Sequence, residues 1–180
     1  MTYVFLADGF EEIEALTPVD ILRRAGEKVI TVGVTGKEVT GAHGIVIVAD
    51  STIEEESTHN ENPNLIVLPG GLPGADNLRA NAIVRELILR ADRSGALIAA
   101  ICAAPRILGE LGLLGGKRAV CYPGFEKYLT NAKLSSDRVV RDANIITAVG
   151  MGASVEFALC LVDALKSTEE MDRLKKGIIA

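Results

Sequence analysis

The sequence predicts an α/β fold in which a mainly parallel sheet has helices on both faces. Two observations lead to this prediction. Short apolar runs alternate with helix patterns along the whole chain, and residues 65–68 and 96–101 are apolar throughout. Such uninterrupted runs are typical of strands buried on both faces of a parallel sheet. A length of 180 residues and the lack of internal repeats favour one domain, residues 1–180.

The strands and helices are expected in a regular order along the chain. Strands are predicted at residues 2–7, 27–34, 65–68, 96–101 and 144–149, with shorter candidates at 119–122 and 138–141 and a hairpin at 39–48. Helices are predicted at residues 11–25, 82–93, 105–112 and 150–165, and a last one opens with a capping box at 167–170. Residues 51–64 are acidic and polar and predict a short helix followed by a surface loop.

Composition and charge exclude several classes of protein. The chain is 48% hydrophobic and 24% charged, as soluble globular domains are. Its net charge of −5 and its lack of a basic cluster argue against a nucleic-acid partner, and no apolar run is long enough to span a membrane. The first residues lack the pattern of a signal peptide, and the three widely spaced cysteines form no zinc pattern. We therefore expect a cytoplasmic protein with free thiols.

Cys102 is the strongest candidate for a reactive residue. It follows the strand at 96–101 directly, and Pro105 stands where the first turn of the next helix is expected. A strand-to-helix turn exposes one side chain above the sheet and aims free N–H groups at it. The helix N-terminus is also expected to lower the pKa of the thiol. Because cysteine is a common core residue, this stretch alone leaves a packing role open.

Glu14 lies in the helix that follows the first strand. Pro18 lacks the N–H that would bond to the Glu14 carbonyl, which predicts a kink in this helix. First-turn acids such as Glu11, Glu12 and Glu14 are exposed by default. If Glu14 instead lies beside Cys102, burial would raise its pKa and keep it protonated as a hydrogen-bond donor.

Glycines follow the strand at 65–68. Gly70 and Gly71 would let the backbone approach a ligand closely, and the N–H of Gly71 is expected to join that of Ala103 in an oxyanion hole. A simple tight turn is the alternative. The chain has neither G-x-G-x-x-G nor G-x-x-x-x-G-K-[ST], so we expect no nucleotide and no other cofactor.

No histidine is expected beside Cys102. His43 falls in the hairpin and His59 in the polar loop, and we expect both at the surface, with no metal site. The segment 121–125, Cys-Tyr-Pro-Gly-Phe, supplies Tyr122 as a candidate accessory group. The sequence therefore offers a thiol, a carboxyl and a phenol, but no Cys-His pair.

Four motifs resemble the DJ-1/ThiJ/PfpI superfamily, in its DJ-1-like branch. They occupy residues 7–14, 68–78, 99–105 and 150–157 and follow one another in the family's order. The resemblance implies a flavodoxin-like three-layer sandwich related to class I glutamine amidotransferases, and a homodimer. It also implies that Cys102 is the reactive cysteine, that Glu14 is a protonated carboxyl bonded to its thiolate or sulfinate, and that Gly71 and Ala103 are the backbone donors.

The resemblance implies two alternative functions. The leading hypothesis is a cofactor-free enzyme acting on small reactive carbonyls, either a glyoxalase III-like lyase or a deglycase. The alternative is an oxidative-stress sensor or chaperone in which Cys102 is oxidised to sulfinate. Many members have a histidine where Tyr122 stands, and its absence favours the alternative. The protease-like branch has a histidine directly after the cysteine, where this chain has Ala103, so we expect no peptidase.

Overall fold

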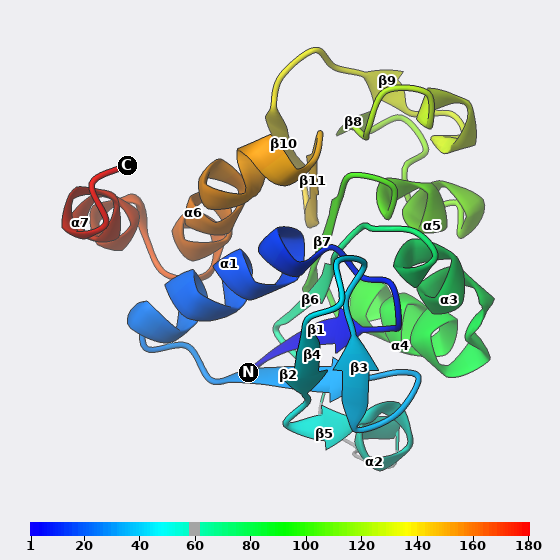
Figure 1. The fold of residues 1–180 in the computed structure, drawn as a ribbon. Coiled ribbons are helices and arrows are strands. Elements are labelled where there is room, and N and C mark those ends of the chain that lie inside the picture. The colour runs from blue at the N-terminus through cyan, green and yellow to red at the C-terminus, as the bar shows by residue number, and fades with distance from the viewer. Residues whose placement is uncertain (58–61) are drawn as a thin grey trace.

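The structure is a computed structural model that describes residues 1–57 and 62–180. Its centre is a seven-stranded sheet (Figure 1) with the strand order β10-β11-β7-β6-β1-β2-β5. Every neighbouring pair is parallel except β10 with β11. The strands are β1 (Thr2–Leu6), β2 (Val29–Gly33), β5 (Ser51–Thr52), β6 (Leu65–Leu68), β7 (Leu97–Ile101), β10 (Val139–Asp142) and β11 (Ile145–Ala148).

Helices cover both faces of this sheet, which confirms the predicted α/β architecture. One face packs against α1 (Glu12–Arg24) and α6 (Ser154–Leu165), and α7 (Thr168–Gly177) packs against α6 (Figure 1). The other packs against α2 (Ile53–Ser57), α3 (Gly74–Ala80), α4 (Ala82–Arg93) and α5 (Pro105–Glu110). Strand β1 shows why the layers form: Tyr3 and Phe5 point into one core, whereas Val4 and Leu6 point into the other.

Two small sheets and two short 3₁₀ helices complete the described chain. The predicted hairpin is present as β3 (Glu38–Thr40) paired antiparallel with β4 (Val46–Val48). Strand β8 (Arg118–Ala119) pairs with β9 (Lys133–Leu134). The 3₁₀ helices are η1 (Glu126–Tyr128) and η2 (Met151–Ala153).

The structure differs from the predicted elements in three places. The strand expected at 119–122 ends at Ala119, because the next N–H groups leave the ladder: Val120 N–H donates to Thr147 Oγ1 at 3.0 Å. Helix α3 was not expected after a stretch rich in proline and glycine. The helix predicted from residue 150 begins as η2, and α6 starts at Ser154.

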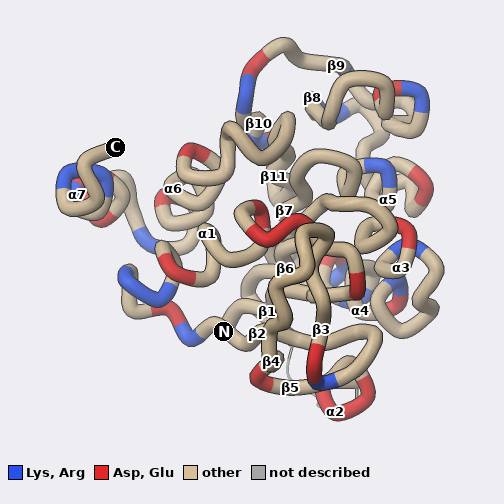
Figure 2. The backbone as a smooth tube through the Cα atoms, viewed as in Figure 1, with Lys and Arg blue, Asp and Glu red and all other residues tan. Residues whose placement is uncertain are grey.

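Charges are spread over the described surface instead of gathered into a basic face (Figure 2). Acidic residues occupy the start of α1, which approaches the carboxyl ends of the central strands (Figures 1 and 2). None of the described helices is both long and apolar enough to cross a membrane. His59 lies outside the described residues.

Candidate active site

Cys102 lies at a sharp turn between β7 and α5. Its φ angle is +66°, a left-handed conformation that residues other than glycine rarely adopt. Two backbone hydrogen bonds hold the turn: Cys102 N–H donates to the Ala148 carbonyl at 2.9 Å, and Tyr122 N–H donates to the Cys102 carbonyl at 2.8 Å. The side chain is half-buried. The strand-to-helix turn is therefore present, and a strained backbone fixes the direction of the thiol.

Two backbone N–H groups interact with the thiol. Those of Ala103 and Gly71 hydrogen-bond to the sulfur and act to lower the pKa of Cys102. Gly71 has a φ of +85°, and a Cβ atom there would lie 2.4 Å from the backbone nitrogen of Glu11. Only glycine fits this turn. The two N–H groups are placed as the sequence predicts, and their role in a reaction stays a prediction.

Glu14 reaches this place from the first turn of α1. It is 1% exposed, and its Oε2 accepts a hydrogen bond from the Gly70 N–H at 2.9 Å. A Cβ atom at Gly70 would lie 2.6 Å from Glu14 Oε2 and 2.6 Å from Cys102 Cβ. Glycine at position 70 therefore leaves the space in which the carboxyl and the cysteine approach each other, and Glu14 is not one of the exposed first-turn acids.

Burial raises the pKa of Glu14 to about 7. Hydrogen bonding with the Cys102 thiol and the Gly70 N–H opposes this rise. Oε1 is buried and has no well-formed hydrogen bond to any residue in the described part of the chain. Oε1 and the Cys102 Sγ each lie 3.8 Å from the place that a Cβ atom of Gly150 would take. Near neutral pH, the carboxyl can therefore gain or lose a proton beside the sulfur.

The pKa of Cys102 is raised to about 12 by burial, and the charge of Glu14 adds to the rise. The prediction that the helix N-terminus lowers this pKa is therefore wrong for a thiol beside an ionised Glu14. The N–H groups of Ala103 and Gly71 oppose the rise without cancelling it, because a carboxylate in a poorly solvated site interacts strongly with a second negative charge. It follows that the thiol ionises more easily when Glu14 holds a proton.

A small cavity of about 230 Å³ lies beside the thiol. Residues of three segments line it: Gly71, Leu72, Cys102, Ala103, Tyr122 and Phe125. The Tyr122 side chain, predicted as an accessory group, is 51% exposed, and its Cδ2 would lie 3.3 Å from a Cβ atom at Gly150. The ring of Tyr122 thus forms a partly exposed part of the cavity wall.

We expect Cys102 to be alkylated at least about tenfold faster than the other two thiols at neutral pH. Burial raises the pKa of Cys121 to about 12 and also raises that of Cys160. Among the described residues, neither thiol has a backbone donor or a carboxyl that shares its proton. Limiting iodoacetamide followed by peptide mass spectrometry measures the three rates. Equal rates at the three cysteines would contradict a reactive turn at Cys102.

One group of side chains has the composition of a metal site. Glu11, Glu12 and His43 place one ligand atom each within 4.8 Å of one another. Both Glu12 oxygens already accept hydrogen bonds from His43, at 2.8 Å from its N–H and at 2.9 Å from Nδ1. His43 is exposed, as predicted, whereas Glu12 is buried. The contacts tie the β3–β4 hairpin to α1, and we assign no metal to them.

Comparison with known proteins identifies the family of this chain. The model of the DJ-1/PfpI family matches residues 2–164. The chain belongs to the DJ-1/PfpI family. It is 36% identical over 179 residues to Protein dj-1beta of Drosophila melanogaster, covering 98% of this chain and 95% of that protein.

Two further relatives bear on the site of this DJ-1/PfpI protein. The glutathione-independent glyoxalase DJR-1.2 of Caenorhabditis elegans is 34% identical over 170 residues, covering 93% of this chain and 89% of the relative. The solved structure of oxidized Toxoplasma gondii DJ-1 superposes with a TM-score of 0.94 at 35% identity, covering 99% of this chain and 97% of the other. The chain is therefore similar to a glyoxalase and to a DJ-1 protein observed in an oxidised state.

The sequence reasoning missed three residues around Cys102 in this DJ-1/PfpI site. Leu72 and Phe125 line the cavity, and Gly150 leaves room for the thiol and for Glu14. A signal existed for Gly150, since it follows an apolar strand and precedes a helix, as Gly70 follows β6. No pattern in the sequence marks Leu72, because an exposed leucine in a loop has no local signature.

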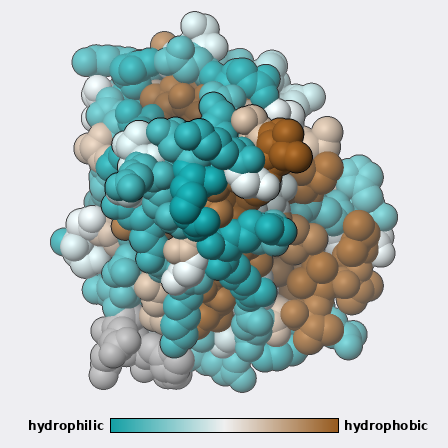
Figure 3. All heavy atoms as spheres, turned by 90° about the vertical axis from the view of Figure 1, so that its left-hand side faces the viewer, coloured by the Kyte–Doolittle hydropathy of each residue, from teal (hydrophilic) through white to brown (hydrophobic). Residues whose placement is uncertain are grey.

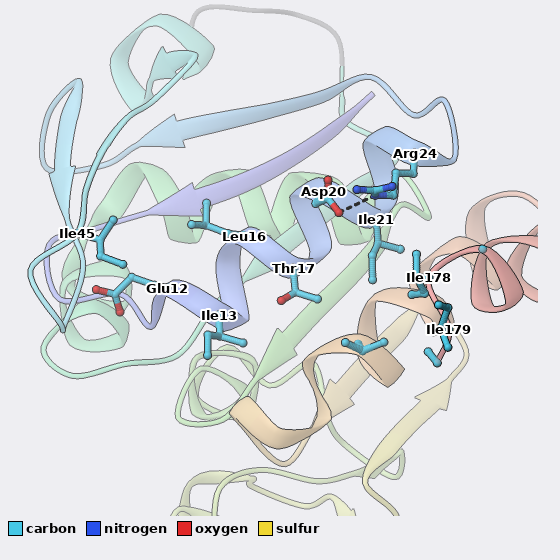
Figure 4. A pocket seen from close by; sticks show the side chains of 13 residues that line it. Glu12, Ile13, Leu16, Thr17, Asp20, Ile21, Arg24, Ile45, Ile178 and Ile179 are labelled. Carbon is cyan, nitrogen blue, oxygen red and sulfur yellow. Dashed lines mark hydrogen bonds and ion pairs between the residues drawn. The ribbon is translucent and has the colours of Figure 1, made fainter.

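A second, larger groove is apolar and has Glu12 among its lining residues. Its volume is about 820 Å³, and it runs along α1 between the β3–β4 hairpin, the start of α6 and the C-terminus (Figure 4). Ile13, Ile45, Val155 and Ile179 are exposed there, and apolar side chains also gather on one side of the face in Figure 3. Val155 in α6 is 42% exposed, because this helix turns Phe157 and Leu161 inward.

Proposed function

We propose that this chain is a cofactor-free enzyme that converts small reactive carbonyls, of the glyoxalase or deglycase kind, through Cys102 and Glu14. The observation that carries the proposal is a buried carboxyl with a pKa of about 7 beside a thiol that also has two backbone donors. Similarity to the glyoxalase DJR-1.2 supports it. A base poised near neutral pH and a held nucleophile are what such a reaction requires.

Glu14 and Cys102 act in the proposal as a pair that shares a proton. Above about pH 7 the pair carries one negative charge. When that charge lies on the sulfur, Glu14 holds the proton and no longer repels the thiolate, while the N–H groups of Gly71 and Ala103 stabilise it. This form of the pair is the nucleophile.

The reaction of methylglyoxal then proceeds without a cofactor. The sulfur of Cys102 attacks the aldehyde carbon, and the oxygen becomes an oxyanion that the N–H groups of Gly71 and Ala103 stabilise. Glu14 gives its proton to this oxygen, which forms a hemithioacetal and leaves Glu14 ionised. The Glu14 carboxylate then moves a proton from the attacked carbon to the neighbouring ketone carbon, while the hydroxyl proton passes to the ketone oxygen, which yields a thioester of lactate. Water cleaves the C–S bond, releasing lactate and the thiol, and the substrate undergoes no net oxidation.

The direct test follows lactate formation from methylglyoxal by the purified protein without glutathione. We expect many lactate molecules per protein molecule, for the native chain and for Cys160→Ser, which removes a thiol outside the site. Loss of methylglyoxal without lactate would show mere covalent capture of the aldehyde and would contradict the enzymatic proposal.

A second candidate function, a sensor of oxidants, is favoured by one observation. The donors around Cys102 suit the oxygens of a sulfinate as well as an oxyanion, and a protonated Glu14 could donate to the same group. Two molecules of hydrogen peroxide would oxidise the thiolate to sulfinate while being reduced to water. Absence of lactate together with two added oxygens on the Cys102 peptide at low peroxide would favour the sensor over the enzyme.

The groove along α1 is proposed as the interface between two copies of this chain. It is apolar, with Ile13 half exposed and Ile179 95% exposed. It also contains an acid and a base on one face, Asp20 and Arg24, which pair at 2.7 Å (Figure 4). A surface with apolar and oppositely charged groups can be self-complementary about a two-fold axis.

We expect Ile13→Asp to convert a native dimer into a monomer, because a charge would be buried in an apolar interface. Light scattering coupled to gel filtration measures the mass. The matched control is Leu134→Asp, which places the same charge at an exposed leucine in β9, outside the groove. A native monomer, or a dimer that survives Ile13→Asp, would contradict the proposed interface.

A further inference from the structure

Arg106 is a buried charged residue that the proposed reaction does not use. It lies in the first turn of α5, directly after the turn that carries Cys102, and is 7% exposed. Charged side chains are seldom buried to this extent unless they are paired. The loss of hydration of this guanidinium must therefore be compensated by contacts with neighbouring segments.

Two contacts of Arg106 reach outside α5. Its Nη2 forms an ion pair with Oδ1 of Asp76 in α3. Its guanidinium carbon lies 5.4 Å from the centre of the Phe125 ring, within the range of a cation–π interaction. The Nε is buried and has no hydrogen-bond partner among residues 1–57 and 62–180, so the aromatic ring is an important part of the compensation.

These contacts join the segments that form the cavity beside the thiol. Helix α5 follows Cys102, helix α3 follows Leu72, and Phe125 itself lines the cavity. Arg106 therefore lies behind the cavity and links its three walls.

The ring of Phe125 also packs against buried residues of the core on this side of the sheet. The ring of Tyr128 lies 5.9 Å from that of Phe125 between ring centres, but Tyr128 belongs to the same short segment and cannot anchor it. The far end of that segment is held against α5, since a Cβ atom at Gly109 would lie 2.0 Å from the Tyr128 carbonyl oxygen. At the near end, backbone hydrogen bonds from Tyr122 N–H to the Cys102 carbonyl and from Phe125 N–H to the Tyr122 carbonyl hold the chain, and the guanidinium of Arg106 lies over the Phe125 ring itself.

We propose that Arg106 is a positioning residue that holds Phe125 as a wall of the Cys102 cavity and so excludes bulky electrophiles from the thiol. The inference rests on Cys102 being the reacting group of the proposed function, but not on the identity of the substrate. A cavity of about 230 Å³ has room for a three-carbon oxoaldehyde but is smaller than typical sites for larger ligands. A bulky reagent therefore requires Phe125 to move.

The test compares two thiol reagents of different size, iodoacetamide and N-phenylmaleimide, at Cys102. The measured quantity is the ratio of the bulky-reagent rate to the small-reagent rate, from peptide mass spectrometry at several pH values. We expect Arg106→Met to raise this ratio about tenfold, because the apolar chain fills the space but does not hold the ring. Arg106→Lys keeps the charge and is expected to restore part of the native ratio.

Two further variants make the result specific. Phe125→Ala should raise the ratio as much as Arg106→Met, and the double variant should add little, because both changes remove the same wall. The matched control is Arg79→Met. Arg79 also approaches Asp76, at 3.6 Å, and bonds to Glu110 at 3.1 Å, but it does not lie over Phe125, so its ratio should remain native.

The outcomes separate this proposal from the proposed function. An unchanged ratio in Arg106→Met, or a ratio in Arg79→Met that rises equally, would overturn the positioning role even if lactate forms. If Arg106→Met does not fold, Phe125→Ala and Arg106→Lys decide: native ratios in both would also overturn it. A raised ratio without any lactate formation would support the role of Arg106 in holding Phe125 and would reject only the glyoxalase reaction.

Discussion

Cys102→Ser is expected to lower lactate formation from methylglyoxal by at least about 1,000-fold. The pKa of a serine hydroxyl is far above that of a thiol, so a Glu14 carboxylate with a pKa of about 7 cannot generate the nucleophile. The measurement is the initial rate of lactate formation at saturating substrate. Serine is close to cysteine in size, and the turn at residue 102 should therefore keep its shape.

The control for this result is Cys160→Ser, which makes the same chemical change in α6 and should retain native activity. Thermal unfolding of both variants should show that the fold is kept. Equal activity in Cys102→Ser and native protein would place the reaction at another residue and would reject the site described here.

Glu14→Gln is expected to lower lactate formation by about 100-fold or more, because the variant cannot move a proton between the two carbons. Glutamine keeps the size of the side chain and an oxygen that can accept from the Gly70 N–H. In the native protein, alkylation of Cys102 should increase as the pH rises through about 7, where the pair loses its first proton. In Glu14→Gln that increase should continue to higher pH instead of levelling off, because no ionised carboxyl forms beside the thiol to oppose its ionisation.

The same substitution has a predictable effect on the free energy of unfolding. The pKa of Glu14 rises from 4.5 to about 7 on folding, so the folded state binds this proton more tightly. Its contribution to stability is complete below about pH 4.5 and is lost as the pH rises through about 7. Relative to Glu14→Gln, the native protein should lose about 3 kcal/mol over this range, at about 1.4 kcal/mol per pH unit.

Chemical denaturation at pH 4.5 and pH 8 measures this difference. The control is Glu54→Gln, a change at an exposed acid in α2, which should shift neither the stability difference nor the alkylation profile. A Glu14→Gln variant with native pH profiles would show that the carboxyl does not interact with Cys102.

The parts of the fold that the sequence predicts are those with a local cause. Residues 65–68 and 97–101 form strands of the central sheet, as the uninterrupted apolar runs at 65–68 and 96–101 predict, and α4 spans residues 82–93 as predicted. The turn at Cys102 also follows from local signals, a buried strand and then a proline at the helix start. Helix α3 has no such signal, because it follows a stretch rich in proline and glycine, which is typical of a loop.

The candidate site depends less on local pattern. Cys102 and Gly71 stand out in the sequence, but the role of Glu14 was expected mainly from the resemblance to the DJ-1 family. No local pattern in the sequence marks Phe125 or Arg106 as part of the site. Their cation–π contact joins two segments that meet only in the folded chain.

The alternation of strands and helices, and the glycines that let the backbone approach Cys102, follow from the amino-acid sequence alone. The burial of Glu14 against the thiol, and the rise that its charge causes in the pKa of Cys102, depend on the folded chain. Electrostatic coupling depends on the distance between two side chains and on the water left between them. Both quantities are set when α1 packs against the ends of β6 and β7.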